Sequence, residues 1–343
     1  MTKTVFFGAV AAAAALLAST SAQAAEGDTL KAVKARGELI CGVNPGLVGF
    51  AAPDANGNWS GFDISLCRAI AAAVVGDPNK VRFVPTTGQT RFTALSSGEV
   101  DVLTRNSTWS FQRDTELALD FPAVNYYDGQ GFLVRKDLGV TSAKELDGAT
   151  VCIQTGTTTE LNLADYFRAN NITYQPVNID SNAEGEQQYL AGACDAYTTD
   201  ASGLAATRAA FADPENHIIL PEIISKEPLA PAVRHGDNNW GDIVRWTLFA
   251  LVAGEEYGVT SANIEELSKS STNPEVQRLL GQTDNLGGMI GLDAEWAKRA
   301  IMANGNYGEI FAATIGEQTP IGLARGLNAL WTQGGLMYAP PFR

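Results

Sequence analysis

The sequence predicts an α/β protein with two lobes, each built on a doubly wound, mostly parallel sheet. Short apolar strands alternate with helical segments between 38 and 103, and the same alternation begins again at Ala149. The length also favours two lobes, because a single core stops growing at about 250–300 residues. From Trp240 onward the pattern favours helices alone, which predicts a helical C-terminal extension.

The first residues have the pattern of an export signal. Lys3 supplies positive charge, 5–18 is an apolar run too short to span a bilayer, and Ala22-Gln23-Ala24 fits the small-x-small cleavage rule. We expect cleavage after Ala24, which leaves 319 of the 343 residues, and a mature protein in the periplasm. No cysteine lies near the cleavage point, so we expect no lipid anchor.

The charge of the chain excludes several classes of partner. The net charge is −14 at pH 7 and becomes −15 when the signal with Lys3 is removed. Such a protein repels nucleic acids and anionic membranes. Neither a metal site nor a cofactor is expected, because no C-x-x-C pair, histidine cluster or phosphate-binding glycine loop occurs, and His217 and His235 are interpreted as structural.

The four cysteines form an even set in a chain that carries an export signal, which favours disulfides. Three pairings are possible among Cys41, Cys67, Cys152 and Cys194. Pairing the first two and the last two would place one disulfide in each lobe, and loops of that size contribute about 3–4 kcal/mol each.

The first lobe is expected from strands at 38–43, 81–84 and 100–103. An amphipathic helix between the first two strands repeats an apolar residue every fourth position, at Phe62, Leu66, Ile70 and Val74. The second lobe is expected from strands at 151–153, 174–177, 196–198 and 217–220, with helices between them. The predicted organisation is a signal at 1–24, lobe 1 at 25–133, lobe 2 at 134–225, and the return to lobe 1 with the extension at 226–343.

The polar loop that follows the strand at 100–103 is the first candidate for a binding site. Ligands of open α/β sheets bind outside the carboxyl ends of the strands. Arg113 presents a fork of donors that matches a carboxylate, and Thr108 and Asn106 can add neutral donors. The alternative is an arginine in a surface salt bridge.

Two segments of the second lobe also end strands with polar residues. Gly156, Thr157 and Thr158 open a helix, where free backbone N–H groups attract anions, although simple helix capping explains them equally well. Asp200 follows the strand at 196–198; it could cap the next helix or accept hydrogen bonds from a ligand ammonium group.

Four motifs in this order resemble the periplasmic solute-binding proteins of ABC importers for polar amino acids, bacterial solute-binding protein family 3. They are Gly61-Phe62-Asp63-Ile64-Ser65-Leu66, the segment from Asp101 to Arg113 with Asp120-Phe121, Gly156-Thr157-Thr158, and Thr199-Asp200. The resemblance covers the whole mature chain. It is greatest to the general L-amino-acid and the glutamate/glutamine/aspartate/asparagine branch, which shares the run Gly305-Asn306-Tyr307-Gly308-Glu309 and the Pro-Pro-Phe-Arg ending.

The resemblance implies a type II periplasmic-binding-protein fold and binding of L-amino acids, polar or acidic ones and their amides, with a broader range left open. It implies that Arg113 binds the α-carboxylate beside Thr108 and Thr158, and that Asp200 binds the α-ammonium with Asn106. Arg91 stands where acidic-amino-acid binders read the ligand side chain. Leu47 replaces the usual covering aromatic, so the expected pocket lining is Phe50, Trp109, Gly156 and Thr157.

A monomer that delivers its ligand to the membrane subunits of an importer is therefore expected. One alternative is an enzyme on the same scaffold, such as a dehydratase or lyase of a carboxylated substrate, but no nucleophile–histidine pair is evident. The other alternative is a sensor that presents its ligand to a receptor, and the sequence does not separate sensing from transport.

Overall fold

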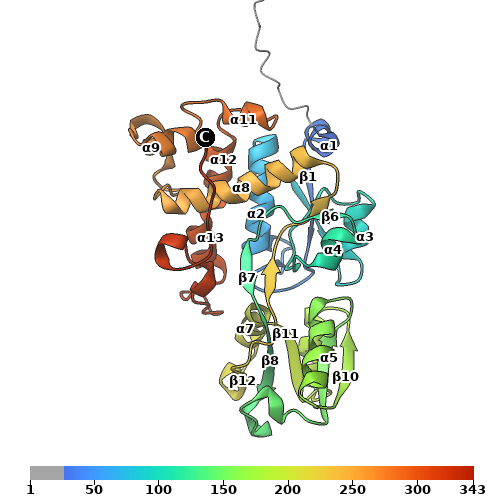
Figure 1. The fold of residues 1–343 in the computed structure, drawn as a ribbon. Helices are drawn as coiled ribbons and strands as arrows, with labels where there is room; N and C mark the ends of the chain where they lie inside the picture. Colours follow the sequence, from blue (N-terminus) through green and yellow to red (C-terminus); the bar gives the residue numbers. More distant parts are fainter. Residues whose placement is uncertain (1–26) are drawn as a thin grey trace, which may run out of the picture.

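The computed structural model describes residues 27–343, so the expected signal and its cleavage after Ala24 lie outside the described residues. Two sheets form two lobes, at the top and bottom of Figure 1. The first has the strand order β4-β1-β5, all parallel, and the second has the order β10-β9-β11-β8-β12. In the second sheet β8 runs antiparallel to its neighbours β11 and β12. The predicted two-lobed α/β class is confirmed.

The first lobe begins with helix α1 and contains a parallel sheet covered by helices. Its elements in chain order are α1 (Asp28–Arg36), β1 (Leu39–Val43), β2 (Ala52–Pro53), β3 (Trp59–Ser60), α2 (Phe62–Val75), β4 (Val81–Pro85), α3 (Arg91–Ser96), β5 (Val102–Leu103), α4 (Phe111–Thr115) and β6 (Leu119–Asp120). Strand β5 is shorter than the expected 100–103. The Asp101 side chain accepts the Ile40 backbone N–H at 2.7 Å, a donor that would otherwise extend the strand pairing.

The second lobe contains five strands and the helices between them. Its elements are β8 (Gln130–Arg135), β9 (Ala149–Gln154), α5 (Thr158–Ala169), β10 (Tyr174–Ile179), α6 (Asn182–Leu190), β11 (Ala196–Asp200), α7 (Ala201–Ala210) and β12 (His217–Ile219). Strand β8 belongs wholly to this sheet, so the chain enters the second lobe before Gln130, a few residues ahead of the expected boundary at 133/134.

Two antiparallel strand pairs connect the lobes and return the chain to the first lobe. Strand β7 (Tyr126–Asp128) pairs with β13 (Glu227–Leu229), which places Glu227 opposite Asp128. Strand β14 (Val233–Arg234) then pairs with β6. In Figure 1, β7 lies between the two lobes, at the level where the carboxyl ends of both sheets face each other.

The C-terminal extension packs on the first lobe. It consists of α8 (Asn238–Glu256), α9 (Ile264–Ser270), α10 (Pro274–Leu279), α11 (Leu286–Met289), α12 (Trp296–Asn304) and α13 (Tyr307–Thr314), followed by short 3₁₀ turns at Gly326–Asn328 and Trp331–Gln333. None of the described helices has the length and apolarity needed to cross a bilayer.

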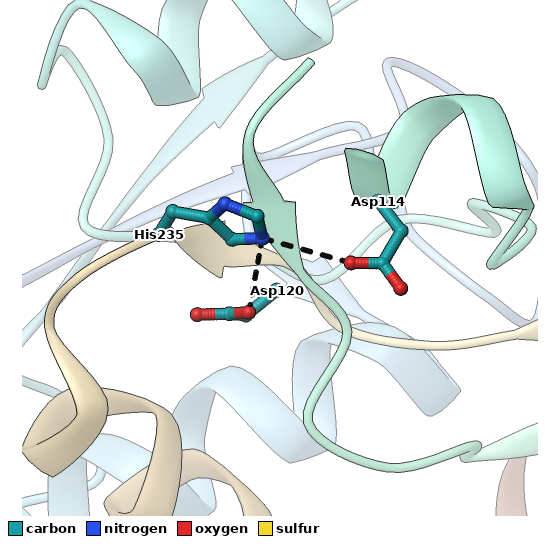
Figure 2. A group of neighbouring side chains, drawn as sticks. All are labelled: Asp114, Asp120 and His235. Carbon is teal, nitrogen blue, oxygen red and sulfur yellow. Dashed lines mark ion pairs between the residues drawn. The ribbon is translucent and has the colours of Figure 1, made fainter. Parts of the chain in front are cut away.

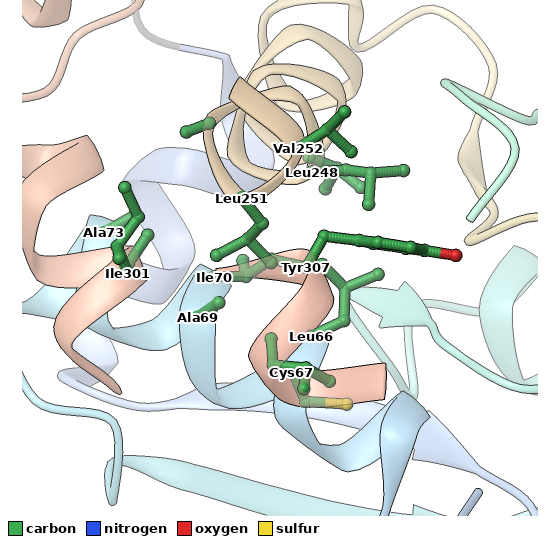
Figure 3. Packing of buried hydrophobic residues seen from close by; sticks show 14 of the residues in the cluster. Leu66, Cys67, Ala69, Ile70, Ala73, Leu248, Leu251, Val252, Ile301 and Tyr307 are labelled. Carbon is green, nitrogen blue, oxygen red and sulfur yellow. The ribbon is translucent and has the colours of Figure 1, made fainter. Parts of the chain in front are cut away.

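Helix α2 differs from the amphipathic helix that the sequence predicts. It is buried around nearly its whole circumference, including Ala69, Ala71, Ala72 and Ala73, because α8 and α12 cover the face that a two-layer lobe would leave in water. Figure 3 shows Ala69, Ile70 and Ala73 of α2 close to Leu251 and Ile301 of these helices. The small alanine side chains let the helices approach closely, so the alanine-rich flank is a packing surface.

The glycine- and aromatic-rich tail covers the same extension. The Arg325 guanidinium forms two bonds to Glu255, at 2.8 and 3.0 Å, and stacks over the Tyr307 ring. Phe342 is 4% exposed and packs edge-on against Trp246, with ring centroids 5.0 Å apart. The tail therefore closes the hydrophobic core of the first lobe.

The cysteines form one disulfide in each lobe. Cys41 pairs with Cys67, and Cys152 pairs with Cys194, closing loops of 26 and 42 residues. We expect the double variant Cys152→Ser/Cys194→Ser to lose about 3–4 kcal/mol of unfolding free energy in the second lobe, because its unfolded chain gains loop entropy. Urea unfolding followed by circular dichroism measures this loss. An unchanged midpoint would contradict it, and ligand affinity should change little, because all four cysteines lie in the cores.

Candidate functional site

Arg113 projects from α4 on the first lobe. Its backbone N–H is capped by the Ser110 hydroxyl at 3.4 Å, which starts the short helix at the end of the polar loop. The guanidinium is 7% exposed, donates to the Thr108 carbonyl at 2.9 Å and stacks 4.9 Å from the Phe92 ring centroid. Burial lowers the pKa of Arg113 to about 10, so the group stays charged at neutral pH. A surface salt bridge does not account for Arg113, because the residue is buried and forms no ion pair among the described residues.

Two more buried arginines lie near Arg113. Arg91, 2% exposed, donates to the Ser107 hydroxyl at 3.1 Å and reaches the Gly156 carbonyl of the second lobe at 3.5 Å. Arg105, 3% exposed, donates to the Thr86 carbonyl at 3.1 Å. Among the described residues, Arg91 Nε and one terminal nitrogen of Arg105 have no hydrogen-bond partner.

The three guanidinium groups raise the local positive potential. Burial lowers the pKa of Arg91 well below its usual value, and the charges of Arg113 and Arg105 lower it further. Burial lowers the pKa of Arg105 to about 10. None of the three forms an ion pair with a described residue. Buried cations are costly unless an anion pairs with them, so this arrangement favours a negatively charged ligand group.

Asp200 ends β11 on the second lobe and is 5% exposed. It occupies the N-cap position of α7, but its side chain caps no backbone N–H of that helix. Asp128 accepts from the Ser202 backbone and hydroxyl instead. The Asp200 side chain therefore does not cap α7. Its carboxylate instead accepts a 3.4 Å hydrogen bond from the Asn106 side chain across the lobe interface.

The electrostatics of Asp200 favour a cationic partner. Burial raises its pKa well above the usual value, and the neighbouring Asp128 and Glu227 carboxylates raise it further. Burial also raises the pKa of Asp128 to about 6 and that of Asp63 to about 7. An ammonium group next to Asp200 would reverse part of this effect, because an opposite charge stabilises the ionised carboxylate.

Thr108 and Thr158 meet at the lobe interface, with their hydroxyl oxygens 3.3 Å apart. Both hydroxyls donate to the same carboxylate oxygen of Glu227, Thr158 at 2.8 Å. Thr157 is the N-cap of α5 and accepts the Glu160 N–H at 3.2 Å, so helix capping accounts for this residue. Gly156 has φ +72° and packs against the Gln89 backbone of the first lobe.

A groove of about 620 Å³ runs between α4 and α5. Arg113, Gly156, Thr157 and Thr158 line it, together with Phe92 and residues of the two helices. Two hydrogen bonds join the lobes nearby, from Gln89 to Thr155 at 2.7 Å and from Asn44 to Asn182 at 3.0 Å. The groove thus places an arginine of one lobe opposite the helix N-terminus of the other.

The two predicted aromatic pocket residues lie elsewhere. Phe50 is 1% exposed and packs edge-on against Phe62 and Tyr126 in the core of the first lobe. Trp109 stacks on Phe121 and donates from its indole nitrogen to Asp114 at 3.1 Å. Neither lines the groove, and their contact with a ligand stays a prediction.

A cluster of Asp114, Asp120 and His235 fixes α4 to the strand pair β6–β14, as Figure 2 shows. The His235 ring nitrogen Nε2 lies 3.6 Å from Asp114 and 3.2 Å from Asp120. The His235 backbone N–H also donates to the Ala118 carbonyl at 3.1 Å. Because Asp114 directly follows Arg113, this cluster sets the position of the arginine, in keeping with the structural interpretation of His235.

Sequence reasoning missed Arg105 and Glu227. Arg105 lies two residues after the end of strand β5, and its position near the carboxyl end of a strand was the available signal. Glu227 lies in the return crossing, where a single acidic residue between Lys226 and Pro228 carries no motif. Only the pairing of β13 with β7 brings it to the lobe interface.

Comparison with known proteins shows the family of the chain. The family model for bacterial extracellular solute-binding proteins, family 3, matches residues 39–263. The chain belongs to this family. The match spans both sheets and both crossings, and the extension after 263 lies outside it.

Known relatives of this solute-binding protein also match the residues that lie outside the family model. It is 69% identical over 343 residues to the glutamate/glutamine/aspartate/asparagine-binding protein of Rhodobacter capsulatus, with 100% of both chains covered. It is 57% identical over 335 residues to the general L-amino acid-binding periplasmic protein of Rhizobium johnstonii, covering 97% of this chain and 98% of that one. A solved Brucella ovis structure, described as an ABC transporter periplasmic binding protein with glutathione bound, is 55% identical. It has a TM-score of 0.90 and covers 92% of this chain and 99% of that chain.

Proposed function

We propose that this protein binds L-amino acids as zwitterions between its two lobes and delivers them to the membrane subunits of an ABC-type importer. The observation that carries the proposal is the pair of unmatched charges at the lobe interface. Arg113 of the first lobe has no carboxylate partner among the described residues, and Asp200 of the second lobe has no cationic one. An amino acid supplies one group for each.

In this mechanism the α-carboxylate lies against Arg113 and the N-terminus of α5, whose first backbone N–H groups have no intrahelical acceptors. The α-ammonium lies against Asp200, with the Asn106 side chain beside it. Each end of the ligand is held mainly by a different lobe, so binding favours the arrangement in which the lobes are together. That arrangement is the form presented to the importer.

The names of the relatives support amino acids as the ligand class. The Rhodobacter capsulatus protein is named for glutamate, glutamine, aspartate and asparagine, and the Rhizobium johnstonii protein for general L-amino acids. A thermal-shift screen of the purified mature protein with the twenty L-amino acids, and their D-forms as controls, tests the proposal. Stabilisation by L-amino acids is expected, and a melting temperature that ignores all of them would refute it.

A peptide such as glutathione is a second candidate ligand, because the Brucella ovis structure is described with glutathione bound. The groove of about 620 Å³ between α4 and α5 offers room beyond Arg113 for a ligand longer than one amino acid. Calorimetric titration with glutathione and with L-glutamate separates the two. Tighter binding of glutathione would identify a peptide-binding member of the family.

The relatives' names describe binding proteins, and we propose a binding protein that acts as a monomer in the periplasm. Incubation with a bound amino acid, followed by chromatographic analysis of the recovered ligand, tests the enzyme alternative. Recovery of a chemically altered ligand would support a dehydratase or lyase. Unaltered ligand in full yield is the expected result.

Arg91 is proposed to read the ligand side chain. We expect Arg91→Ala to weaken binding of glutamate and aspartate by about tenfold to a hundredfold and binding of alanine much less, since a buried charge contact is lost only with the acidic ligands. Calorimetry with the three ligands measures the difference. Equal losses for all three would assign Arg91 a positioning role through Ser107 and Gly156.

A further inference from the structure

The carboxylate of Glu227 lies at the junction of both lobes and the crossing strands. The residue is 1% exposed, and both of its oxygens are hydrogen-bonded. One oxygen accepts from the hydroxyls of Thr108 and Thr158. The other accepts from the Asn162 amide at 2.7 Å and from the Ser225 hydroxyl at 2.5 Å. Thr108 and Thr158 belong to the family motifs in the sequence, but Glu227, Asn162 and Ser225 do not.

The hydroxyl protons of Thr108 and Thr158 limit which groups can donate to a ligand. A threonine hydroxyl has one proton to donate. Thr108 and Thr158 both direct that proton to Glu227, so neither hydroxyl remains a donor for a ligand carboxylate. At the start of α5 the Glu160 N–H is capped by Thr157, and the backbone N–H groups before it remain as the donors that a helix N-terminus offers to an anion.

Glu227 and its partners come from three parts of the fold. Thr108 belongs to the first lobe, Thr158 and Asn162 belong to α5 of the second lobe, and Glu227 itself lies on the crossing strand β13. If the lobes separated, Thr108 and Thr158 would move apart, and one carboxylate oxygen would no longer accept from both. These bonds therefore form together only when the lobes are in contact.

We propose that Glu227 is a positioning residue for ligand binding. It orients Thr108 and Thr158 through their hydroxyls, sets the N-terminus of α5 opposite Arg113, and links lobe contact to the crossing strands. This inference rests on the proposed function. No described cation lies within ion-pairing distance of Glu227, but its negative charge is the strongest nearby influence that favours the charged form of Arg113.

A double-mutant cycle tests the proposal. Glu227→Gln keeps the size of the side chain but removes the charge and one acceptor oxygen, and Thr158→Val removes only the hydroxyl. We expect Glu227→Gln to weaken L-glutamate and L-glutamine binding by the same factor, about tenfold to a hundredfold, because it acts on the shared α-carboxylate. We expect Thr158→Val to add little to Glu227→Gln, since the two changes break the same bond.

Glu222→Gln is the matched control. Glu222 lies between β12 and β13, shortly before Glu227, and also accepts from a hydroxyl, that of Ser142, but this bond lies within the second lobe. The Glu222→Gln variant should bind L-glutamate and L-glutamine with the affinity of the unmodified protein. Wild-type affinity in Glu227→Gln, or losses that add fully in the double variant, would overturn the inference, because Thr158 would then serve the ligand directly. An unmodified protein that binds no amino acid would instead refute the proposed function.

Discussion

Replacing Arg113 by alanine should weaken the binding of every L-amino acid by about 2–5 kcal/mol, which is about 30-fold to several thousand-fold in affinity. The guanidinium is the charged donor of the first lobe that lines the groove opposite the start of α5. When the guanidinium is lost, the desolvated carboxylate of the ligand keeps only backbone N–H groups as hydrogen-bond donors. Isothermal titration calorimetry on refolded, ligand-stripped protein measures the effect.

The Arg113 variant should fold normally, which separates a binding defect from misfolding. The charge of Arg113 disfavours the charged forms of Arg91 and Arg105, so its removal relieves repulsion in the ligand-free protein. The melting temperature without ligand should therefore not fall markedly. Arg82→Ala is the control, because Arg82 is exposed and forms a 3.7 Å ion pair with Glu38. Near-normal affinity of the Arg113 variant would remove the carboxylate assignment.

The sequence predicted the lobes well because their signals are local. The strand at 151–153 and the helix that Gly156, Thr157 and Thr158 open follow from local sequence signals, and these elements appear as β9 and α5. The burial of α2 around nearly its whole circumference could not be predicted in this way. Which faces of a helix are buried depends on α8 and α12, more than 160 residues away in the chain, and no local pattern encodes that contact.

The residues of the candidate site differ in the same way: some have a local signal in the sequence, and others depend on tertiary contacts. Arg113, Thr158 and Asp200 were found because each follows a strand or opens a helix, and the carboxyl ends of parallel strands gather at one edge. Arg91 was added by the resemblance to a family, whereas Asn106 was found on the polar loop that follows the strand at 100–103. Glu227 was missed because its importance comes from three tertiary contacts and not from its neighbours in sequence. The packing of Phe50 against Phe62 and Tyr126 is likewise a tertiary contact that no local pattern encodes, and its contact with a ligand stays a prediction.

Replacing Asp200 by asparagine should weaken L-amino-acid binding by about 2–5 kcal/mol and should also change its pH dependence. In the unmodified protein, burial and the Asp128 and Glu227 carboxylates raise the pKa of Asp200, which favours the protonated carboxyl group in the ligand-free protein as the pH falls. An ammonium group requires the ionised carboxylate, and binding must displace that proton. Affinity should therefore rise with pH, by at most about tenfold per pH unit for this one group, until the pH exceeds the pKa of Asp200.

The asparagine variant should show a much flatter profile, because the amide does not titrate. A residual slope is expected from Asp128 and Asp63, whose pKa values are raised to about 6 and about 7. Asp213→Asn is the control, since Asp213 lies on the same lobe with an exposed side chain next to His217. Calorimetry between pH 5.5 and 8.5 distinguishes the cases. An Asp200 variant that kept both the affinity and the slope of the unmodified protein would show that the ammonium group is bound elsewhere.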